Sequence, residues 1–175
     1  MHKLLLWLSF RMHQLWFRVR DRRFPPSAIL EEAGVQPGDC VLDYGCGSGS
    51  YSFAAAELVG PSGHVYAADI NPFALRHVTQ VAEARGLANM SAIQSEQATG
   101  LPDGSVDVAL LYDTLHDLVD PAGVLAELRR VLKPNGVLSF ADHHLSEDAA
   151  LAAVTAEGRF ALGQRGAHTY GFRGI

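Results

Sequence analysis

Val41-Leu-Asp-Tyr-Gly-Cys-Gly-Ser-Gly49 is the stretch that decides the fold of this chain. An apolar run ends there at Asp43, and glycines follow at every second position: Gly45, Gly47 and Gly49. Because glycine has no Cβ, this backbone can turn sharply and lie directly against a ligand. The helix expected next, Tyr51–Leu58, would present its free N–H groups to that ligand. The stretch therefore predicts a strand, a ligand-binding loop and a helix.

The spacing of the glycines separates this loop from two other nucleotide-binding loops. In the dinucleotide fingerprint G-x-G-x-x-G the third glycine would stand at position 50, where this chain has Ser50. The chain also contains no Gly-Lys-Ser/Thr, which excludes a P-loop. The carboxylate of Asp43 would repel a pyrophosphate, whereas it suits a cationic ligand that carries an amino group and a sulfonium.

This strand–Asp-x-Gly-x-Gly-x-Gly–helix pattern resembles motif I of the class I S-adenosylmethionine-dependent methyltransferases. The resemblance covers the chain from about Leu30 to the C-terminus. It implies an α/β fold with a doubly wound, mostly parallel seven-stranded sheet, a C-terminal antiparallel hairpin and helices on both faces. It also implies S-adenosylmethionine as the cofactor and S-adenosylhomocysteine as the product.

Patterns typical of strands and helices alternate along the rest of the chain, and such alternation predicts a parallel sheet with helices on both faces. Expected strands are Cys40–Tyr44, His64–Ile70, Met90–Gln94, Val106–Tyr112 and Val137–Asp142, and Arg159–Gln164 with Thr169–Arg173 form a closing hairpin. Expected helices are one capped by Ser27 that runs to Ala33, then Tyr51–Leu58, Pro72–Arg85, Pro121–Leu132 and Ser146–Ala156, with a turn at Lys133–Gly136.

The first two strands of the predicted sheet end in candidate cofactor ligands, because such sheets bind ligands at the carboxyl ends of their strands. The first strand supplies Asp43 and the loop residues Gly45, Cys46, Gly47 and Gly49. The expected role of the Cys46 side chain is packing. Asp69 ends the second strand, where a carboxylate can accept both ribose hydroxyls, and Ile70 offers an apolar wall to the adenine.

The third and fourth strand ends complete the predicted cofactor site. Glu96 and Gln97 follow the third strand, where the resemblance implies a contact to the adenine amino group. The family usually has Asp there, so Glu96 is a near match. Asp113 follows the fourth strand, at the family's position facing the methionine moiety and the transferred methyl. Glu96 as a surface charge and Asp113 as a turn cap remain alternatives.

Two segments could face the transferred methyl: Asp113–Asp117, which includes His116, and Asp142-His143-His144. Methyl transfer is an in-line displacement, in which the enzyme positions the nucleophile, desolvates it and removes a proton where needed. Histidine has the pKa of a general base, so His116 and His143 are the catalytic candidates. These histidines and aspartates would also permit a metal site, but no metal is expected. The plain alternative is that they are polar residues of ligand-facing loops.

Other motifs narrow the class of acceptor. The fourth strand is not followed by Asn/Asp-Pro-Pro-Tyr, no Pro-Cys supplies a cytosine-methylating nucleophile, and the cysteines expected of arsenite methyltransferases are absent. Leu101–Asp107 and Leu132–Gly136 resemble the branch that contains quinone-biosynthesis and other small-molecule methyltransferases. We therefore expect a small, apolar acceptor. A nucleic acid is disfavoured, because the body of the chain is acidic.

Charge is unevenly distributed over the 175 residues, whose formal net charge is −5. Residues 1–23 carry six basic side chains against Asp21 alone, and Met1–Phe24 shows the periodicity of an amphipathic helix. The expected organisation is this helix over residues 1–26 and a methyltransferase domain over residues 27–175. The helix could be a lid, a homodimer contact or a peripheral membrane anchor. The two cysteines lack metal spacing and indicate a reducing, cytoplasmic setting.

Two further classes of function compete with methyl transfer. The domain could bind S-adenosylmethionine without catalysis, as a sensor or scaffold. A nicotinamide-dependent oxidoreductase is disfavoured because Ser50 stands where the dinucleotide fingerprint needs glycine and because Asp43 would repel a pyrophosphate.

Overall fold

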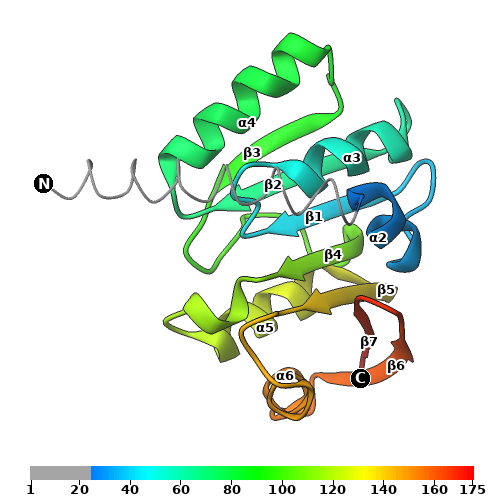
Figure 1. Cartoon of the computed structure of the whole chain (residues 1–175), viewed down its shortest axis with the longest axis vertical. Coiled ribbons are helices and arrows are strands. Elements are labelled where there is room, and N and C mark those ends of the chain that lie inside the picture. Colours follow the sequence, from blue (N-terminus) through cyan, green and yellow to red (C-terminus); the bar gives the residue numbers. More distant parts are fainter. Residues whose placement is uncertain (1–24) are drawn as a thin grey trace, which may run out of the picture.

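The computed structural model describes residues 25–175, and strands alternate with helices along most of that length (Figure 1). The expected N-terminal helix of residues 1–24 lies outside the described residues. The helices are α2 (Pro26–Glu32), α3 (Ser50–Val59), α4 (Pro72–Arg85), the short 3₁₀ helix η1 (Leu115–Asp117), α5 (Pro121–Val131) and α6 (Glu147–Thr155). The strands are β1 (Cys40–Tyr44), β2 (His64–Asp69), β3 (Met90–Gln94), β4 (Val106–Tyr112), β5 (Leu132–Ala141), β6 (Phe160–Arg165) and β7 (Tyr170–Gly174).

These strands form one seven-stranded sheet in the order β3-β2-β1-β4-β5-β7-β6. The pairs from β3 to β5 are parallel, and β7 is antiparallel to both β5 and β6. The predicted doubly wound sheet with a terminal antiparallel hairpin is therefore confirmed. The chain winds outward in one direction from β1 and in the other from β4. The carboxyl ends of these two strands form the switch point, where ligands bind in open α/β sheets.

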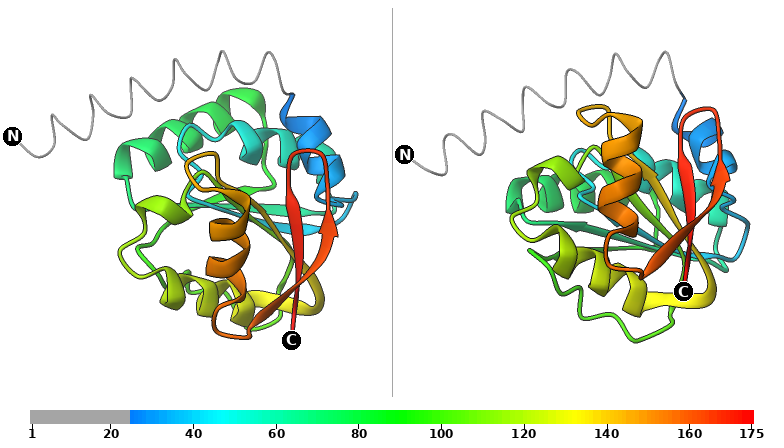
Figure 2. Two further views of the ribbon diagram at one scale, coloured as in Figure 1. Left: turned by 60° about the horizontal axis from the view of Figure 1, so that its bottom comes forward. Right: turned by 90° about the horizontal axis from the view of Figure 1, so that it is seen from below.

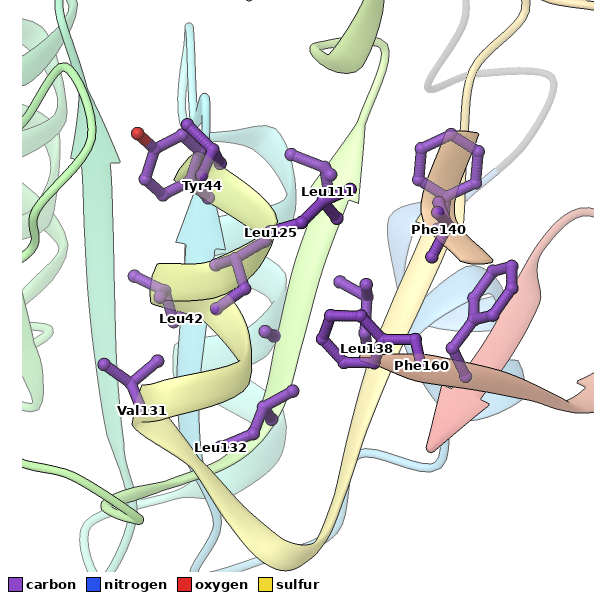
Figure 3. Close-up of a cluster of buried hydrophobic side chains, with 14 of the residues drawn as sticks. Leu42, Tyr44, Leu111, Leu125, Val131, Leu132, Leu138, Phe140 and Phe160 are labelled. Atoms are coloured by element: carbon purple, nitrogen blue, oxygen red, sulfur yellow. The ribbon is translucent and has the colours of Figure 1, made fainter. Parts of the chain in front are cut away.

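The core lies on both faces of the sheet, since neighbouring residues of a buried strand point to opposite faces. On one face, Leu42, Leu111 and Leu138 pack with Leu125 of α5 and Phe160 of β6 (Figure 3). On the other face, Val41, Val65 and Leu110 pack with apolar residues of α2 and α3, and residues of α3 and α4 cover Ala67. Apolar layers therefore cover both faces of the sheet. Figure 2 shows helices packed along the sheet.

Two predicted boundaries were wrong. Helix α2 begins at Pro26, so Ser27 lies inside its first turn and does not cap it. Proline suits that first position because its ring fixes φ and the first N–H has no helical partner. The turn predicted at Lys133–Gly136 belongs to β5 as a bulge, because Leu132 already pairs with Val106 and the next register pair is Val108 with Val137.

A carboxylate ties the N-terminal helix of the described chain to the C-terminal hairpin. Glu32, at the end of α2, accepts hydrogen bonds from the backbone N–H groups of Ala167, His168 and Thr169 and from Thr169 Oγ1. Figure 2 shows α2 beside the hairpin turn in both views. These bonds hold the pKa of Glu32 below its ordinary value, although burial opposes them. Within residues 25–175, no helix is long and apolar enough to cross a membrane.

Candidate functional site

A cavity of about 500 Å³ opens at the carboxyl edge of the sheet, between the loops that follow β1, β2, β3 and β4. Most of the predicted cofactor residues line it: Gly45, Gly47, Asp69, Ile70, Glu96, Gln97 and Asp113. These residues are separated by up to 68 positions in the sequence and meet because the four strands end at one edge. The location is the switch point expected from the topology.

Asp69 links two loops of the cavity through backbone N–H groups. Its Oδ2 accepts the Gly47 N–H at 2.8 Å, and its Oδ1 accepts the Asn71 N–H at 2.7 Å. Burial raises the pKa of Asp69 above its ordinary value, and these backbone donors only partly offset that effect. Each carboxylate oxygen has more than one lone pair, so both can still accept a hydroxyl from a vicinal diol.

Gly45 and Gly49 of the loop each allow a close contact that a side chain would block. Gly45 has φ +81°, and a Cβ at this position would overlap the side chain of Thr114 from the loop after β4. Its N–H and that of Cys46 both donate to the Ala68 carbonyl, at 2.8 and 3.0 Å. Gly49 precedes α3 with φ +80°, and a Cβ there would lie 2.8 Å from Val78 Cγ2. Gly45 thus permits close approach at the cavity, whereas Gly49 permits close packing of α3 against α4.

Three residues predicted as cofactor ligands are not among the residues that line the cavity: Asp43, Cys46 and Gly49. Asp43 is buried, and Ser52 Oγ of α3 donates to its Oδ2 at 2.5 Å. Cys46 packs with Phe53, Ala67 and Leu75, and burial raises the pKa of its thiol well above the ordinary value. Strand alternation explains the position of Asp43, because the neighbouring Tyr44 takes the other face and lines the cavity.

The segment after β3 has no helix and is held in place by side chains. Gln97 packs against Gly123 at the first turn of α5, where a Cβ would overlap its amide. Thr99, two residues further on, donates from its backbone N–H and its hydroxyl to Glu127 Oε1, at 2.7 and 2.6 Å. Glu127 also receives two hydrogen bonds from Arg130, and these lower its pKa to about 2. Glu96 and Gln97 therefore stand on an anchored loop.

The cavity wall is acidic. Five carboxylates line it: Asp69, Glu96, Asp113, Asp117 and Asp120. No lysine, arginine or histidine of residues 25–175 lines it. In a partly buried cleft such an arrangement favours a positively charged ligand and disfavours a phosphate. The wall therefore suits a sulfonium with an amino group better than a dinucleotide.

The predicted catalytic histidines lie beside the cavity and are not among its lining residues. His143 Nδ1 is 2.8 Å from Asp113 Oδ1, and His116 Nδ1 is 2.9 Å from Asp142 Oδ2. Asp113 itself lines the cavity and has φ +48°, the only positive φ of a non-glycine residue between positions 25 and 175. In that same part of the chain, no group of three or more His, Cys, Asp or Glu side chains could hold a metal ion.

Sequence reasoning missed several residues of the wall. Tyr44 and Asn71 directly adjoin the predicted Gly45 loop and Ile70, and Leu118, Val119 and Asp120 extend the loop after β4. Asp120 also caps helix α5, since its Oδ1 accepts the Gly123 N–H at 2.9 Å. Tyr44 and Asn71 could have been found from their position beside a predicted strand end, whereas Leu118 and Val119 follow the short helix η1 and had no such signal.

Comparison with known proteins gives the family. A profile of the family described as "Methyltransferase domain" matches residues 36–167, which is most of the chain. The chain belongs to this family. The resemblance to class I methyltransferases is thereby confirmed, and S-adenosylmethionine is the cofactor that the family supports.

Similar proteins with curated names include quinone methyltransferases. A demethylmenaquinone methyltransferase from Geobacillus stearothermophilus is 34% identical over 131 residues, which are 74% of this chain and 52% of that protein. A 2-phytyl-1,4-naphtoquinone methyltransferase from Trichormus variabilis is 32% identical over 140 residues, which are 79% of this chain and 57% of that protein. The chain thus spans about half the length of the curated relatives it matches. These similarities confirm the quinone-biosynthesis branch as the one it resembles.

Solved structures agree with the fold. A SAM dependent methyltransferase from Aquifex aeolicus superimposes with a TM-score of 0.78 at 27% identity, covering 89% of this chain and 91% of that one. The [4+2]-cyclase SpnF superimposes with a TM-score of 0.68 at 20% identity, and at that identity the likeness concerns the fold alone.

Proposed function

We propose that this chain is an S-adenosylmethionine-dependent methyltransferase that acts on a small, apolar acceptor of the quinol type. The observation that carries the proposal is the acidic cavity in which the glycine loop and Asp69 are joined by the Gly47 N–H at 2.8 Å. The names of the similar proteins support the acceptor class, because they are quinone methyltransferases.

The residues that line the cavity suit the chemical groups of the cofactor, in the sequence from ribose and adenine to the methionine part. Asp69 would accept the ribose hydroxyls, Ile70 would cover the adenine, and Glu96 with Gln97 would contact the adenine amino group. The N–H groups and small surface of Gly45 and Gly47 would face the methionine part, near Asp113. Asp43, Cys46 and Gly49 would act through the loop, because Asp43 and Cys46 are buried and Gly49 packs against α4.

The cofactor supplies an electrophilic methyl group on a positively charged sulfur. The chain would hold the acceptor in line with that methyl and exclude water from it. Leu118 and Val119 line the cavity beside Asp117, and the Val119 side chain is fully exposed. The apolar ring of the acceptor would pack against these two side chains. His116 or His143 would remove the acceptor proton, as histidine can near neutral pH.

The role of the N-terminal residues 1–26 is a separate part of this proposal. We propose a lid over the cavity as its role. A homodimer contact and a peripheral contact with an anionic membrane are the alternatives, and a lipid-like acceptor would make lid and membrane contact compatible.

The test is transfer of a radiolabelled methyl group from S-adenosylmethionine to reduced 1,4-naphthoquinones with and without a prenyl chain, with phenols and thiols as further acceptors. The proposal expects label in a quinol product and formation of S-adenosylhomocysteine. Binding of the cofactor without transfer to any of these acceptors would favour a sensor or scaffold.

A further inference from the structure

Two crossed Asp–His pairs join the loops that follow β4 and β5. Asp113, after β4, accepts hydrogen bonds from the backbone N–H and Nδ1 of His143, at 2.9 and 2.8 Å. Asp142, after β5, accepts from the backbone N–H and Nδ1 of His116, at 3.2 and 2.9 Å. Each loop therefore contributes the aspartate that binds the histidine of the other.

The two pairs differ in their surroundings. The Asp142 side chain is 0% exposed, and its second oxygen accepts the His144 N–H at 3.0 Å. The His116 ring is 21% exposed and stacks on His144, with ring centroids 4.1 Å apart. The His143 ring is 69% exposed. Water competes for an exposed pair, so the His143 ring is weakly fixed, whereas the His116 ring is held by Asp142 and by the stack on His144.

The buried pair determines which ring nitrogen of His116 can take up a proton. A carboxylate only accepts hydrogen bonds, so Nδ1 of His116 must carry the hydrogen, and Nε2 then keeps its lone pair. Nε2 lies 3.6 Å from Asp117 Oδ2, and Asp117 lines the cavity. The basic nitrogen is therefore next to the wall of the site.

We propose that Asp142 is a positioning residue that fixes His116 as the proton acceptor of the reaction, while the His143–Asp113 pair ties the two loops together. This inference rests on the proposed function. The acceptor's hydroxyl proton moves to Nε2 of His116, and the electron pair left on the acceptor forms the bond to the methyl carbon. The methyl–sulfur bond breaks with its electrons going to sulfur. Asp142 and Asp117 flank the imidazolium that results, and it returns its proton to water.

The first test needs no acceptor and measures the ring tautomer by ¹⁵N NMR of labelled protein, with His116→Gln used to assign the signals. We expect His116 to carry its hydrogen on Nδ1 at a pH where the ring is neutral. Asp142→Asn should abolish that preference, whereas the matched variant Asp113→Asn should leave it unchanged. A hydrogen on Nε2 in the unchanged protein would overturn the proposal.

The second test measures turnover of an acceptor identified by the methyl-transfer assay. His116→Ala should lower kcat by roughly 100-fold, the usual contribution of a general base, and added imidazole should restore part of it. Asp142→Asn should lower kcat by about tenfold or more and change its pH profile, because the base loses its fixed tautomer. Calorimetry should show unchanged cofactor affinity in both variants, and turnover should fall further in His116→Ala than in His143→Gln.

The outcomes separate this inference from the proposed function. Loss of turnover in His143→Gln with retention in His116→Ala would overturn the assignment of the base. An Asp142→Asn variant that loses only thermal stability, with an unchanged pH profile, would reduce Asp142 to a structural role. If the unchanged protein methylates no acceptor, the proposed acceptor class fails, and the NMR result alone then decides the role of Asp142.

Discussion

Two proposed parts of the site, a cofactor end at the glycine loop and Asp69 and an acceptor end at the loops after β4 and β5, are built by different means. At the cofactor end, backbone groups make the contacts: the Gly47 and Asn71 N–H groups donate to Asp69, and Gly45 is anchored to the Ala68 carbonyl. At the acceptor end, side chains make them, through the crossed pairs of His116 with Asp142 and His143 with Asp113. A backbone-built end tolerates little change in conformation, whereas a side-chain-built end can change its chemistry by substitution.

The largest expected effect comes from Gly45→Ala. The left-handed φ costs an alanine about 1–2 kcal/mol, and overlap with Thr114 adds about 1–3 kcal/mol of repacking. Unfolding free energy should fall by the sum, and cofactor affinity should fall with it. Gly34→Ala is the matched control, because Gly34 has φ +82° and open space around its Cβ position. Equal losses in the two variants, measured by denaturant unfolding, would show that the close approach of the loops is unimportant.

Next in size is Asp69→Ala. Hydrogen bonds to a charged group contribute about 1.5–3 kcal/mol, so cofactor affinity should fall by about 10- to 100-fold in calorimetry. Because burial raises the pKa of Asp69, binding by the carboxylate should weaken on acidification from above the ordinary value of 3.8. Asp103→Ala, at an exposed site away from the cavity, is the control. Unchanged affinity in Asp69→Ala would remove the ribose assignment.

Glu127 is an exception at the cofactor end, because its side chain, and not a backbone group, holds the loop after β3 through Thr99. Its folded pKa of about 2 lies below the ordinary 4.5, chiefly through the hydrogen bonds from Arg130. The carboxylate therefore contributes stability that is fully present above pH 4.5 and is lost as the pH falls toward 2. Glu127→Gln should lower unfolding free energy by about 1–2 kcal/mol at pH 7.

That difference between the unchanged protein and Glu127→Gln should shrink between pH 4.5 and pH 2, as followed by urea unfolding at each pH. A difference that stays constant over this range would show that the charge of Glu127 does not matter. Glu157→Gln, whose partner Arg159 forms an exposed pair, should have almost no effect at any pH.

The smallest expected effect is that of Ile70→Ala. Ile70 is 57% exposed at the cavity, and covering its exposed apolar surface should contribute about 0.5 kcal/mol to cofactor binding. Affinity should therefore fall by about two- to threefold. Val119→Ala is the informative partner, since we expect it to affect acceptor KM and leave cofactor affinity unchanged. The opposite pattern would contradict the placement of the cofactor beside Ile70 and of the acceptor beside Val119.

The cofactor end could be predicted from the sequence because its geometry follows from local rules. Glycines at alternate positions indicate a backbone with unusual angles. Parallel strands end at one edge of the sheet, so Asp69, Glu96 and Asp113 meet there for any conformation of the loops. The orientation of Asp43 away from the cavity could also have been predicted, since strand alternation places its side chain on the face opposite to that of Tyr44.

The acceptor end could not be predicted in the same way. The pairs of His116 with Asp142 and of His143 with Asp113 join residues 26 and 30 positions apart. The pairing of each histidine with its aspartate depends on how the irregular loops after β4 and β5 pack, and no periodic pattern in the sequence predicts that packing. The bulge at Lys133–Gly136 is a similar case, since Lys133 reaches back to Asp107 of β4 at 2.7 Å.

The proposed function requires that the acidic cavity at the carboxyl edge bind S-adenosylmethionine. Calorimetric titration of the protein with S-adenosylmethionine, S-adenosylhomocysteine and NADH tests it most directly. We expect micromolar binding of the two sulfur compounds and no binding of NADH. Binding of NADH, or no binding of either sulfur compound, would contradict it.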